Sequence, residues 1–218
     1  MAQRVAAEDF RPRALFDSFG IEVLATTDDP LDSLEAHRRL AEDVNFSGRV
    51  LPTFRPDRYT KFGPDFASAV GALVDSAGGG IEGYRGYIEA LESRRRHFID
   101  HGAVSTDHGA HTPMTLKLDE AEAARLYQKG LDGTATAQEA HAFEGHMMYQ
   151  MARMSSEDGL VMTLHPGVHR SIHSPTLKRF GPDTGHDIPF AVDYVTGLKP
   201  VLDDFGTAEG FHLSLIHI

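Results

Sequence analysis

The chain of 218 residues contains no cysteine and no tryptophan. Without thiols it can form neither disulfides nor thiolate metal sites. No apolar run approaches the ~20 residues that a membrane-spanning helix requires. The first ten residues, MAQRVAAEDF, also lack the apolar core of a signal peptide. We therefore expect a cytoplasmic protein that does not bind a membrane.

Basic charge is scarce as well, because the formal net charge is −11. A nucleic-acid-binding protein usually carries a basic face, and here the one dense basic run is Arg94-Arg95-Arg96. This run falls near the end of a predicted helix, where cations favour the helix dipole. We expect no nucleic-acid partner. Histidine, in contrast, occurs 13 times, and it both titrates near neutrality and ligates metals.

Short β-rich runs alternate with helical patterns along the whole chain, which predicts a single α/β domain with parallel strands. The expected strands cover residues 21–27, 49–54, 103–108, 160–165 and 210–216. The expected helices cover residues 11–19, 31–42, 64–76, 81–101, 119–131, 137–158 and 190–205.

Single residues qualify this assignment. Thr136 is a suitable N-cap for the helix at 137–158, Pro52 weakens the second strand, and Pro200 is expected to kink or split the last helix. A doubly wound sheet and a barrel both fit the alternation. No Gly-x-Gly-x-x-Gly motif follows a predicted strand, which disfavours a dinucleotide-binding sheet.

Polar residues follow four successive predicted strands. In chain order they are Thr26-Thr27-Asp28-Asp29, Arg55-Pro56-Asp57, Thr106-Asp107-His108 and His165. In a (β/α) barrel the carboxyl ends of the strands form one face, and the active site is built there. The series therefore predicts a site at the strand ends.

Each of these residues also has a structural interpretation. Asp28 and Asp29 suit a helix cap as well as a site. For Asp57 we favour a turn closed on its own backbone. Arg55 follows an apolar strand, where an unpaired guanidinium would be costly, so we favour a bound carboxylate over a salt bridge. Asp107 and His108 are expected to form an orienting pair at the mouth of the site.

The histidines also have both a structural interpretation and a possible role in the site. His108 is a site candidate or is satisfied by local backbone, whereas His165 follows an apolar strand and favours a site role. The loop HPGVHRSIH adds His169, Arg170 and His173, but its Pro-Gly pair makes a helical metal-binding spacing unfavourable. The remaining helical histidines are expected to be solvated: His37, His97, His101, His141 and His146.

The segments that carry these residues resemble the uronate (glucuronate) isomerases, a branch of the metal-dependent amidohydrolase superfamily. The resemblance rests on TTDDP, FRPD, TDHG and the HPG loop in this order, within residues 10–213. It implies a partial, distorted (β/α)8 TIM-like barrel with additional helices. It also implies aldose–ketose isomerisation of D-glucuronate to D-fructuronate, and of D-galacturonate to D-tagaturonate, through an enediol.

The resemblance also implies roles for single residues. Arg55 would bind the substrate carboxylate, which suits a planar guanidinium. Arg170 and Asp28 are further substrate-binding candidates, and Asp107, His108 and His165 are the catalytic candidates. The implied partner is a small uronate sugar, and formation of a homo-oligomer is left open.

This chain departs from the family at both ends. Family members begin with a strand that carries a His-x-His metal pair and end the barrel with a metal-binding aspartate. We find neither, so we expect a barrel over residues 1–212 that lacks terminal strands, with the family's divalent metal, zinc, bound elsewhere. One alternative is a hydrolase of the same superfamily that uses metal-bound hydroxide. Another is an inactive truncated product with unpaired edge strands.

The last six residues, LSLIHI at 213–218, match the translation of a common sequencing adapter. We therefore expect a non-native tail. The alternative is a genuine short β-strand.

Overall fold

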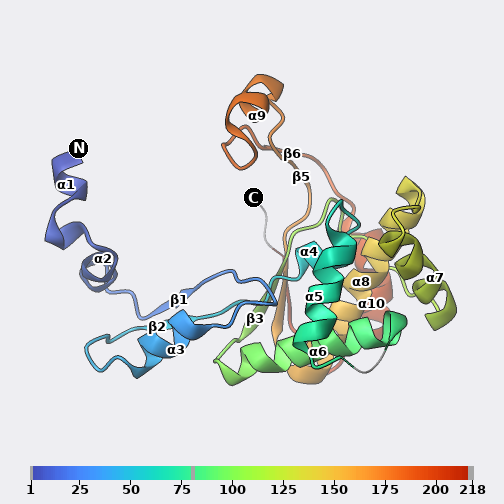
Figure 1. The fold of residues 1–218 in the computed structure, drawn as a ribbon, viewed down its shortest axis with the longest axis horizontal. Coiled ribbons are helices and arrows are strands. Elements are labelled where there is room, and N and C mark those ends of the chain that lie inside the picture. Colours follow the sequence, from blue (N-terminus) through green and yellow to red (C-terminus); the bar gives the residue numbers. More distant parts are fainter. Residues whose placement is uncertain (1, 80–81, 216–218) are drawn as a thin grey trace.

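The computed structural model describes residues 2–79 and 82–215, arranged as short strands beside a layer of helices (Figure 1). The strands are β1 (Val23–Ala25), β2 (Arg49–Leu51), β3 (Ser105–His108), β4 (Val161–Leu164), β5 (Val168–His169), β6 (Ile188–Pro189) and β7 (Leu213–Leu215).

The strands are parallel except for the β5–β6 pair. β1 pairs with β2, and β3, β4 and β7 form a second sheet. Phe54 joins the two sheets, because it bridges Asp28 on one side and Thr106 on the other. The parallel strands of the described chain therefore follow one another in sequence order. A doubly wound sheet would instead reverse its order at a switch point. The α/β class with parallel strands is confirmed.

The helices differ in length, and only some of them belong to the main helical layer. They are α1 (Ala2–Val5), the 3-10 helix η1 (Glu8–Phe10), α2 (Pro12–Ser18), α3 (Glu35–Glu42), α4 (Asp57–Thr60), α5 (Phe66–Ser76), α6 (Gly83–Asp100), α7 (Glu120–Leu131), α8 (Ala137–Asp158), α9 (Ser174–Phe180) and α10 (Tyr194–Phe205). Helices α5 to α8 and α10 form one layer, whereas α1 and α2 lie far from it (Figure 1). None of the described helices combines the length and the apolar character needed to cross a membrane.

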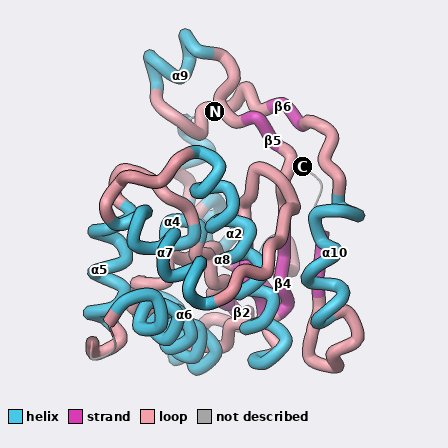
Figure 2. The backbone as a smooth tube through the Cα atoms, turned by 90° about the vertical axis from the view of Figure 1, so that its right-hand side faces the viewer, coloured by secondary structure: helices cyan, strands magenta, loops and turns pink. Residues whose placement is uncertain are grey.

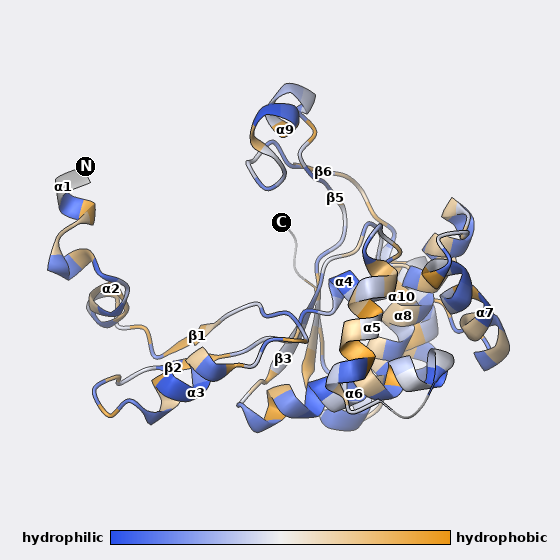
Figure 3. Ribbon diagram, viewed as in Figure 1, coloured by the Kyte–Doolittle hydropathy of each residue, from blue (hydrophilic) through white to orange (hydrophobic). Residues whose placement is uncertain are grey.

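Apolar and aromatic side chains form the core of this helical layer. The rings of Phe62 and Phe143 stack with centroids 4.5 Å apart, and Tyr87 stacks on Tyr127 at 5.1 Å. Burying such rings supplies most of the favourable free energy of packing. Figure 3 shows the contrast between the largely hydrophobic α5 and the hydrophilic α3.

Local sequence signals explain several element boundaries. Thr136 and Glu139 form a capping box at the start of α8, which confirms the predicted N-cap. β2 ends at Leu51, just before Pro52, because proline cannot donate to a ladder. Helix α10 continues through Pro200, so a split of this helix is wrong, whereas the alternative, a kink, stays a prediction.

Two other features of the fold differ from expectation. The segment expected to be a long loop after β4 contains β5, α9 and β6, and it stands away from the helical layer (Figure 2). Arg95 does more than complement a helix dipole: its side chain is 1% exposed and binds the Asp158 carboxylate through Nε at 2.6 Å and Nη2 at 2.9 Å.

The expected tail at 213–218 is described only in part. Leu213–Leu215 form β7, which pairs with Met162–Leu164 of β4. Residues 216–218 lie outside the described residues. A non-native origin of this segment stays a prediction.

Candidate active site

A cavity of about 240 Å³ lies at the carboxyl ends of the strands β3 and β4. Its walls come from the segment after β2, the loop after β3 and the β4–β5 connection. The lining residues are Arg55, Asp57, Lys61, Gly109, Ala110, His111, His165, Val168 and Arg170. Three of the six residues expected at the site, namely Arg55, His165 and Arg170, therefore border one pocket.

Asp107 and His165 form a close pair beside this pocket. The His165 Nε2 atom lies 2.6 Å from Asp107 Oδ1, and the parallel register places Thr163 next to Asp107, whose Oδ1 accepts from the Thr163 hydroxyl at 3.2 Å. An ionised carboxylate can only accept, so Nε2 carries the hydrogen. The lone pair of neutral His165 then resides on Nδ1, which has no partner among the described residues.

The surroundings of Asp107 favour its ionised form. Burial raises the pKa of this carboxyl. The hydrogen bond from His165 and the charge of Arg55 oppose burial, and the pKa of Asp107 falls below its usual value. The pair is thus a carboxylate that fixes the tautomer of an imidazole, an arrangement used for proton transfer.

Arg55 lies between two carboxylates. Its Nη1 is 3.2 Å from Asp107 Oδ2, and its Nε is 3.3 Å from Asp57 Oδ2. The structure therefore contains the salt bridges that the sequence disfavoured for this arginine. The side chain is still 37% exposed, and Arg55 is one of the residues that line the pocket.

Asp57 does not close a turn on its own backbone, so that expectation is wrong. Both carboxylate oxygens accept from the Gly109 N–H, at 3.2 and 3.1 Å. The Lys61 ammonium lies 3.8 Å from Asp57 and donates to the Gly109 carbonyl. Burial raises the pKa of Asp57 despite the opposing effects of Lys61, Arg55 and the Gly109 N–H. Asp57 thus ties the segment after β2 to the end of β3.

Arg170 directly follows β5 and lines the pocket. Its Nη1 donates to Asp187 Oδ2 at 2.9 Å, and Asp187 Oδ1 accepts from the Ser171 N–H. The Arg170 side chain is 48% exposed. The ion pair holds this guanidinium at the pocket rim while leaving donors free to face a ligand.

Asp28 lies away from the pocket, in contrast to its expected substrate-binding role. Its carboxylate accepts from the Thr26 hydroxyl at 2.7 Å and the Thr53 N–H at 3.2 Å, and it lies 3.8 Å from His37 Nε2. It does not cap a helix either, because α3 begins after Leu34. These contacts satisfy the carboxylate within the sheet.

His108 is a core residue rather than a pocket residue. It is 1% exposed, and its Nε2 contacts the Thr106 hydroxyl at 2.9 Å. Burial lowers the pKa of His108 to about 3, which keeps the ring neutral. The orienting role expected for it at the mouth of the site finds no support in this geometry.

Other histidines also differ from expectation. His37 and His146 are buried instead of solvated, and His146 Nε2 contacts the Tyr84 hydroxyl at 2.7 Å. The histidines of the HPGVHRSIH loop separate in space. His169 packs on Phe190 at 4.5 Å, whereas His173 shares the Thr176 hydroxyl with His186.

Five pocket residues were not expected from the sequence: Lys61, Gly109, Ala110, His111 and Val168. Lys61 lies one helical turn after Asp57, a spacing at which side chains meet, so the sequence did contain a signal for it. Gly109 follows the predicted third strand directly. His111 stands two residues further on, and its ring packs 4.8 Å from Phe190, a contact that only the fold creates.

The described residues do not supply a metal site. No group of three or more histidine, aspartate or glutamate side chains is close enough to hold an ion within residues 2–79 and 82–215. His165 and Asp107 bind each other, and Asp107 also faces Arg55. We therefore assign no metal-dependent step to these residues.

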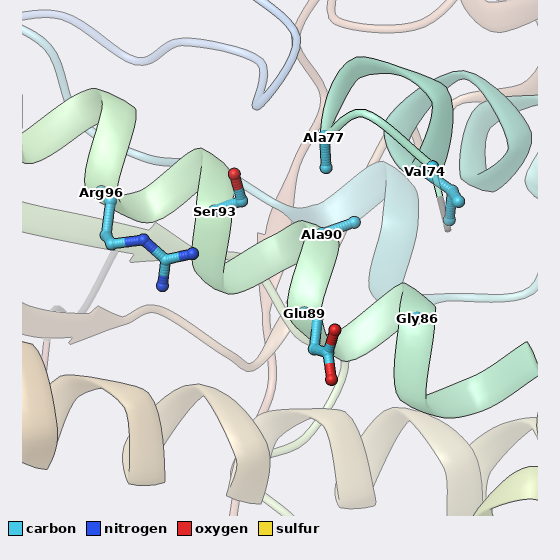
Figure 4. Close-up of a pocket in the computed structure, with 8 residues that line it drawn as sticks. Val74, Ala77, Gly86, Glu89, Ala90, Ser93 and Arg96 are labelled. Atoms are coloured by element: carbon cyan, nitrogen blue, oxygen red, sulfur yellow. The ribbon is translucent and has the colours of Figure 1, made fainter. Parts of the chain in front are cut away.

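A second hollow of about 160 Å³ lies between α5 and α6 (Figure 4). Val74 and Ala77 line it from the end of α5, while Glu89, Ser93 and Arg96 line it from α6. It includes no residue from the strand ends, so we place the candidate site in the first pocket. The geometry thus defines an α/β protein with a polar pocket at the carboxyl ends of parallel strands.

The chain belongs to the glucuronate isomerase family, whose model matches residues 1–216. Uronate isomerase from Corynebacterium efficiens is 51% identical over 219 residues, which is 100% of this chain and 47% of the relative. Its counterpart from Corynebacterium glutamicum is 53% identical over 93% of this chain and 39% of the relative. The chain therefore spans about half the length of these relatives. The family is metal-dependent in general.

Solved structures of the same family are also similar to this chain. The crystal structure of glucuronate isomerase from Caulobacter crescentus matches with a TM-score of 0.89 and 39% identity, over 98% of this chain and 45% of that one. Uronate isomerase from Thermotoga maritima matches with a TM-score of 0.85 and 31% identity, over 94% and 46%. The resemblance expected from the sequence is confirmed.

Proposed function

We propose that the chain forms the substrate-binding and proton-transfer part of a uronate isomerase. The full protein would convert D-glucuronate to D-fructuronate, and D-galacturonate to D-tagaturonate, through an enediol. The observation that carries this proposal is the Asp107–His165 pair at 2.6 Å beside a pocket lined by Arg55 and Arg170. Family membership supports an isomerase over the alternative hydrolase.

In this proposal Arg55 and Arg170 bind the anionic end of the sugar. Each guanidinium is held by an aspartate, namely Asp107 for Arg55 and Asp187 for Arg170. A guanidinium held in this way loses less side-chain entropy when a carboxylate binds, and charge-assisted hydrogen bonds to carboxylates are strong.

Isomerisation moves one proton from C2 to C1 and another from the O2 hydroxyl to the O1 carbonyl oxygen, and we assign the transfer between the oxygens to His165. Asp107 fixes the tautomer of the ring and stabilises the imidazolium that forms when His165 takes up a proton. The proton would leave the O2 hydroxyl and return to the O1 oxygen, so the ring ends the cycle as it began.

The (β/α)8 barrel is part of this proposal. Its support is the sequential order of the parallel strands, which a barrel requires and a doubly wound sheet does not show. The divalent metal of the family, zinc in our proposal, would be held by residues outside this chain.

A chimaera tests the function directly. Residues 1–212 of this chain would replace the matched segment of the Corynebacterium efficiens uronate isomerase, and D-glucuronate isomerisation would be assayed with and without zinc. We expect an active chimaera and an inactive 218-residue chain. A folded chimaera without isomerase activity would contradict the proposal, and activity in the short chain would show that its own residues suffice.

A further inference from the structure

One side of the pocket belongs to an arm, which we define as residues 168–189 (β5, α9 and β6). The arm stands away from the helical layer (Figure 2), and none of the seven residues of α9, all of which the structure describes, is buried. Arg170 nevertheless lines the pocket, and its side chain is 48% exposed. The place of this guanidinium therefore depends on how the arm is attached to the rest of the molecule.

The arm is held together by contacts between its own residues. Its two strands pair over two residues each. Beyond this short ladder, Arg170 donates to Asp187 at 2.9 Å, and the Ile172 N–H donates to the His186 carbonyl at 3.0 Å. The guanidinium of Arg170 is thus fixed relative to the arm, and it would move with the arm.

Three rings join the base of the arm to the loop after β3. The ring of Phe190 lies 4.5 Å from that of His169 on β5 and 4.8 Å from that of His111, measured between centroids. The two histidine rings are 5.6 Å apart, so Phe190 makes the two closest contacts of the cluster. Rings packed in this way attract each other beyond the effect of burial alone.

Backbone bonds at Gly167 give the arm a first point of attachment. The Gly167 N–H donates to the His111 carbonyl at 3.2 Å, and the Gly167 carbonyl accepts from the Phe190 N–H at 2.9 Å. Gly167 has a φ of +90°, a conformation that glycine adopts without strain. One point of attachment leaves the direction of the arm free to vary. The ring cluster is a second point, and two points together fix that direction.

We propose that Phe190 is a positioning residue: by packing on His111 and His169 it holds the arm in the direction that places the Arg170 guanidinium at the pocket. This inference rests on the proposed function, in which Arg170 binds the anionic end of the sugar, and deepens it. Within the described chain Phe190 is not among the residues that line this pocket, so it acts through Arg170. A displacement of about 1 Å at such a group can cost about 10²-fold.

Phe190→Leu in the chimaera tests the inference, because leucine keeps the apolar bulk and removes the ring. We expect KM for D-glucuronate to rise about tenfold, with kcat changed less than about twofold. Phe190→Tyr keeps the ring and should restore the parent KM. The matched control is Phe180→Leu at the end of α9, where the ring is 61% exposed, and its KM should stay constant. An unchanged KM in a folded Phe190→Leu protein would overturn the inference.

A double-mutant cycle separates the positioning of Arg170 from a general structural role. In an Arg170→Met chimaera, Phe190→Leu should raise KM less than about twofold, because the group that it places is gone. A tenfold rise in that background as well would show that Phe190 acts by another route.

His169→Leu removes the other ring of the closest contact at an exposed position, where substitutions seldom unfold a protein. It should raise KM by a factor similar to that of Phe190→Leu. An unchanged KM in this variant would refute the inference even if Phe190→Leu does not fold.

Calorimetric binding of D-gluconate distinguishes this inference from the proposed function. D-gluconate is a six-carbon sugar acid without the aldehyde, so it presents a carboxylate to Arg170 but does not isomerise. We expect its Kd to rise about tenfold in Phe190→Leu and to stay constant in Phe180→Leu. This pattern in a chimaera without isomerase activity would contradict only the proposed function. An equal Kd in the two variants of an active chimaera would contradict only the role of Phe190.

Discussion

Two clusters that contain an aspartate and a histidine lie at strand ends of this molecule, and they differ in how the aspartate contacts the histidine. In the β1–β2 cluster (Thr26, Asp28 and His37) the Thr26 hydroxyl lies 2.7 Å from both Asp28 Oδ2 and His37 Nε2, and it separates the two side chains. In the β3–β4 cluster (Asp107, Thr163 and His165) the carboxylate and the imidazole contact each other directly at 2.6 Å.

The surroundings of the two clusters differ as well. Asp107 lies 3.2 Å from the Arg55 guanidinium, and His165 lines the pocket. In the described part of the chain, Asp28 forms no ion pair with a lysine or arginine, and its cluster does not line the pocket that holds His165. The same residue types at the same kind of position thus serve stability in one case. They suit chemistry in the other, where a cation and an open cavity adjoin the pair.

The largest expected effect separates the two histidines. His165→Gln in the chimaera should lower kcat about 10²–10⁴-fold, the usual contribution of a general acid–base group. His37→Gln, the matched substitution in the β1–β2 cluster, should change kcat less than about twofold while lowering the thermal midpoint. Steady-state kinetics measure both variants, and an equal loss of kcat in the two would break the comparison.

His108, the buried neighbour of the β3–β4 cluster, should make stability depend on pH. Its pKa is lowered from 6.5 to about 3 by burial. Between these values the unfolded chain takes up a proton that the folded chain excludes. Stability is therefore complete above pH 6.5 and falls as the pH drops towards 3.

Urea unfolding of the 218-residue chain between pH 7 and pH 4 measures this loss. We expect it to reach several kcal/mol, since each pKa unit corresponds to about 1.4 kcal/mol. His108→Asn removes the titrating ring, so its stability should vary less with pH than that of the parent. Parallel pH curves for the two proteins would show that His108 does not cause the effect.

Arg55 should matter for substrate binding more than for stability. Arg55→Met removes a charge-assisted contact worth about 1.5–3 kcal/mol, so KM for D-glucuronate should rise about 10- to 100-fold. Arg58 provides the control, because it lies three residues away, is about half exposed and pairs with Asp65. If Arg58→Met raised KM as much, general charge attraction would explain the effect rather than a specific clamp.

The smallest expected effects come from the threonines of the two clusters. Thr26→Val leaves the Asp28 carboxylate and His37 without their shared hydroxyl, which should cost about 1–2 kcal/mol of folding free energy with unchanged KM and kcat. Thr163→Val removes one hydrogen bond to Asp107, so it should shift the pH profile of kcat. Thermal unfolding and pH–rate profiles separate the two outcomes. A change of kcat in Thr26→Val would contradict the structural role of the β1–β2 cluster.

The sequence predicted much of this fold because its signals are local. The capping residue Thr136 and the apolar run of β4 each lie within or beside the element that they define. The structure of the long segment after β4 was harder to predict from the sequence. Its two-residue strands and the short helix α9 have no periodicity long enough to detect.

The site was predicted in part for the same reason. Arg55 and His165 directly follow apolar strands, so their positions at the strand ends follow from the local pattern. Asp57 was misjudged because its partner, the Gly109 N–H, lies 52 residues away. His108 was misjudged because alternate residues of β3 point to opposite faces, and the sequence did not show which face was the core.

The sequence by itself determined the alternation of strands and helices, the polar residues at the strand ends and the resemblance to one family. These properties depend on backbone propensities and residue order. Only the tertiary structure decided which strand-end residues share a pocket, that Arg55 lies between two carboxylates, and that the Gly109 N–H donates to Asp57. Such contacts join segments far apart in the chain, because burial and hydrogen bonding act through distance in space rather than through position in the sequence.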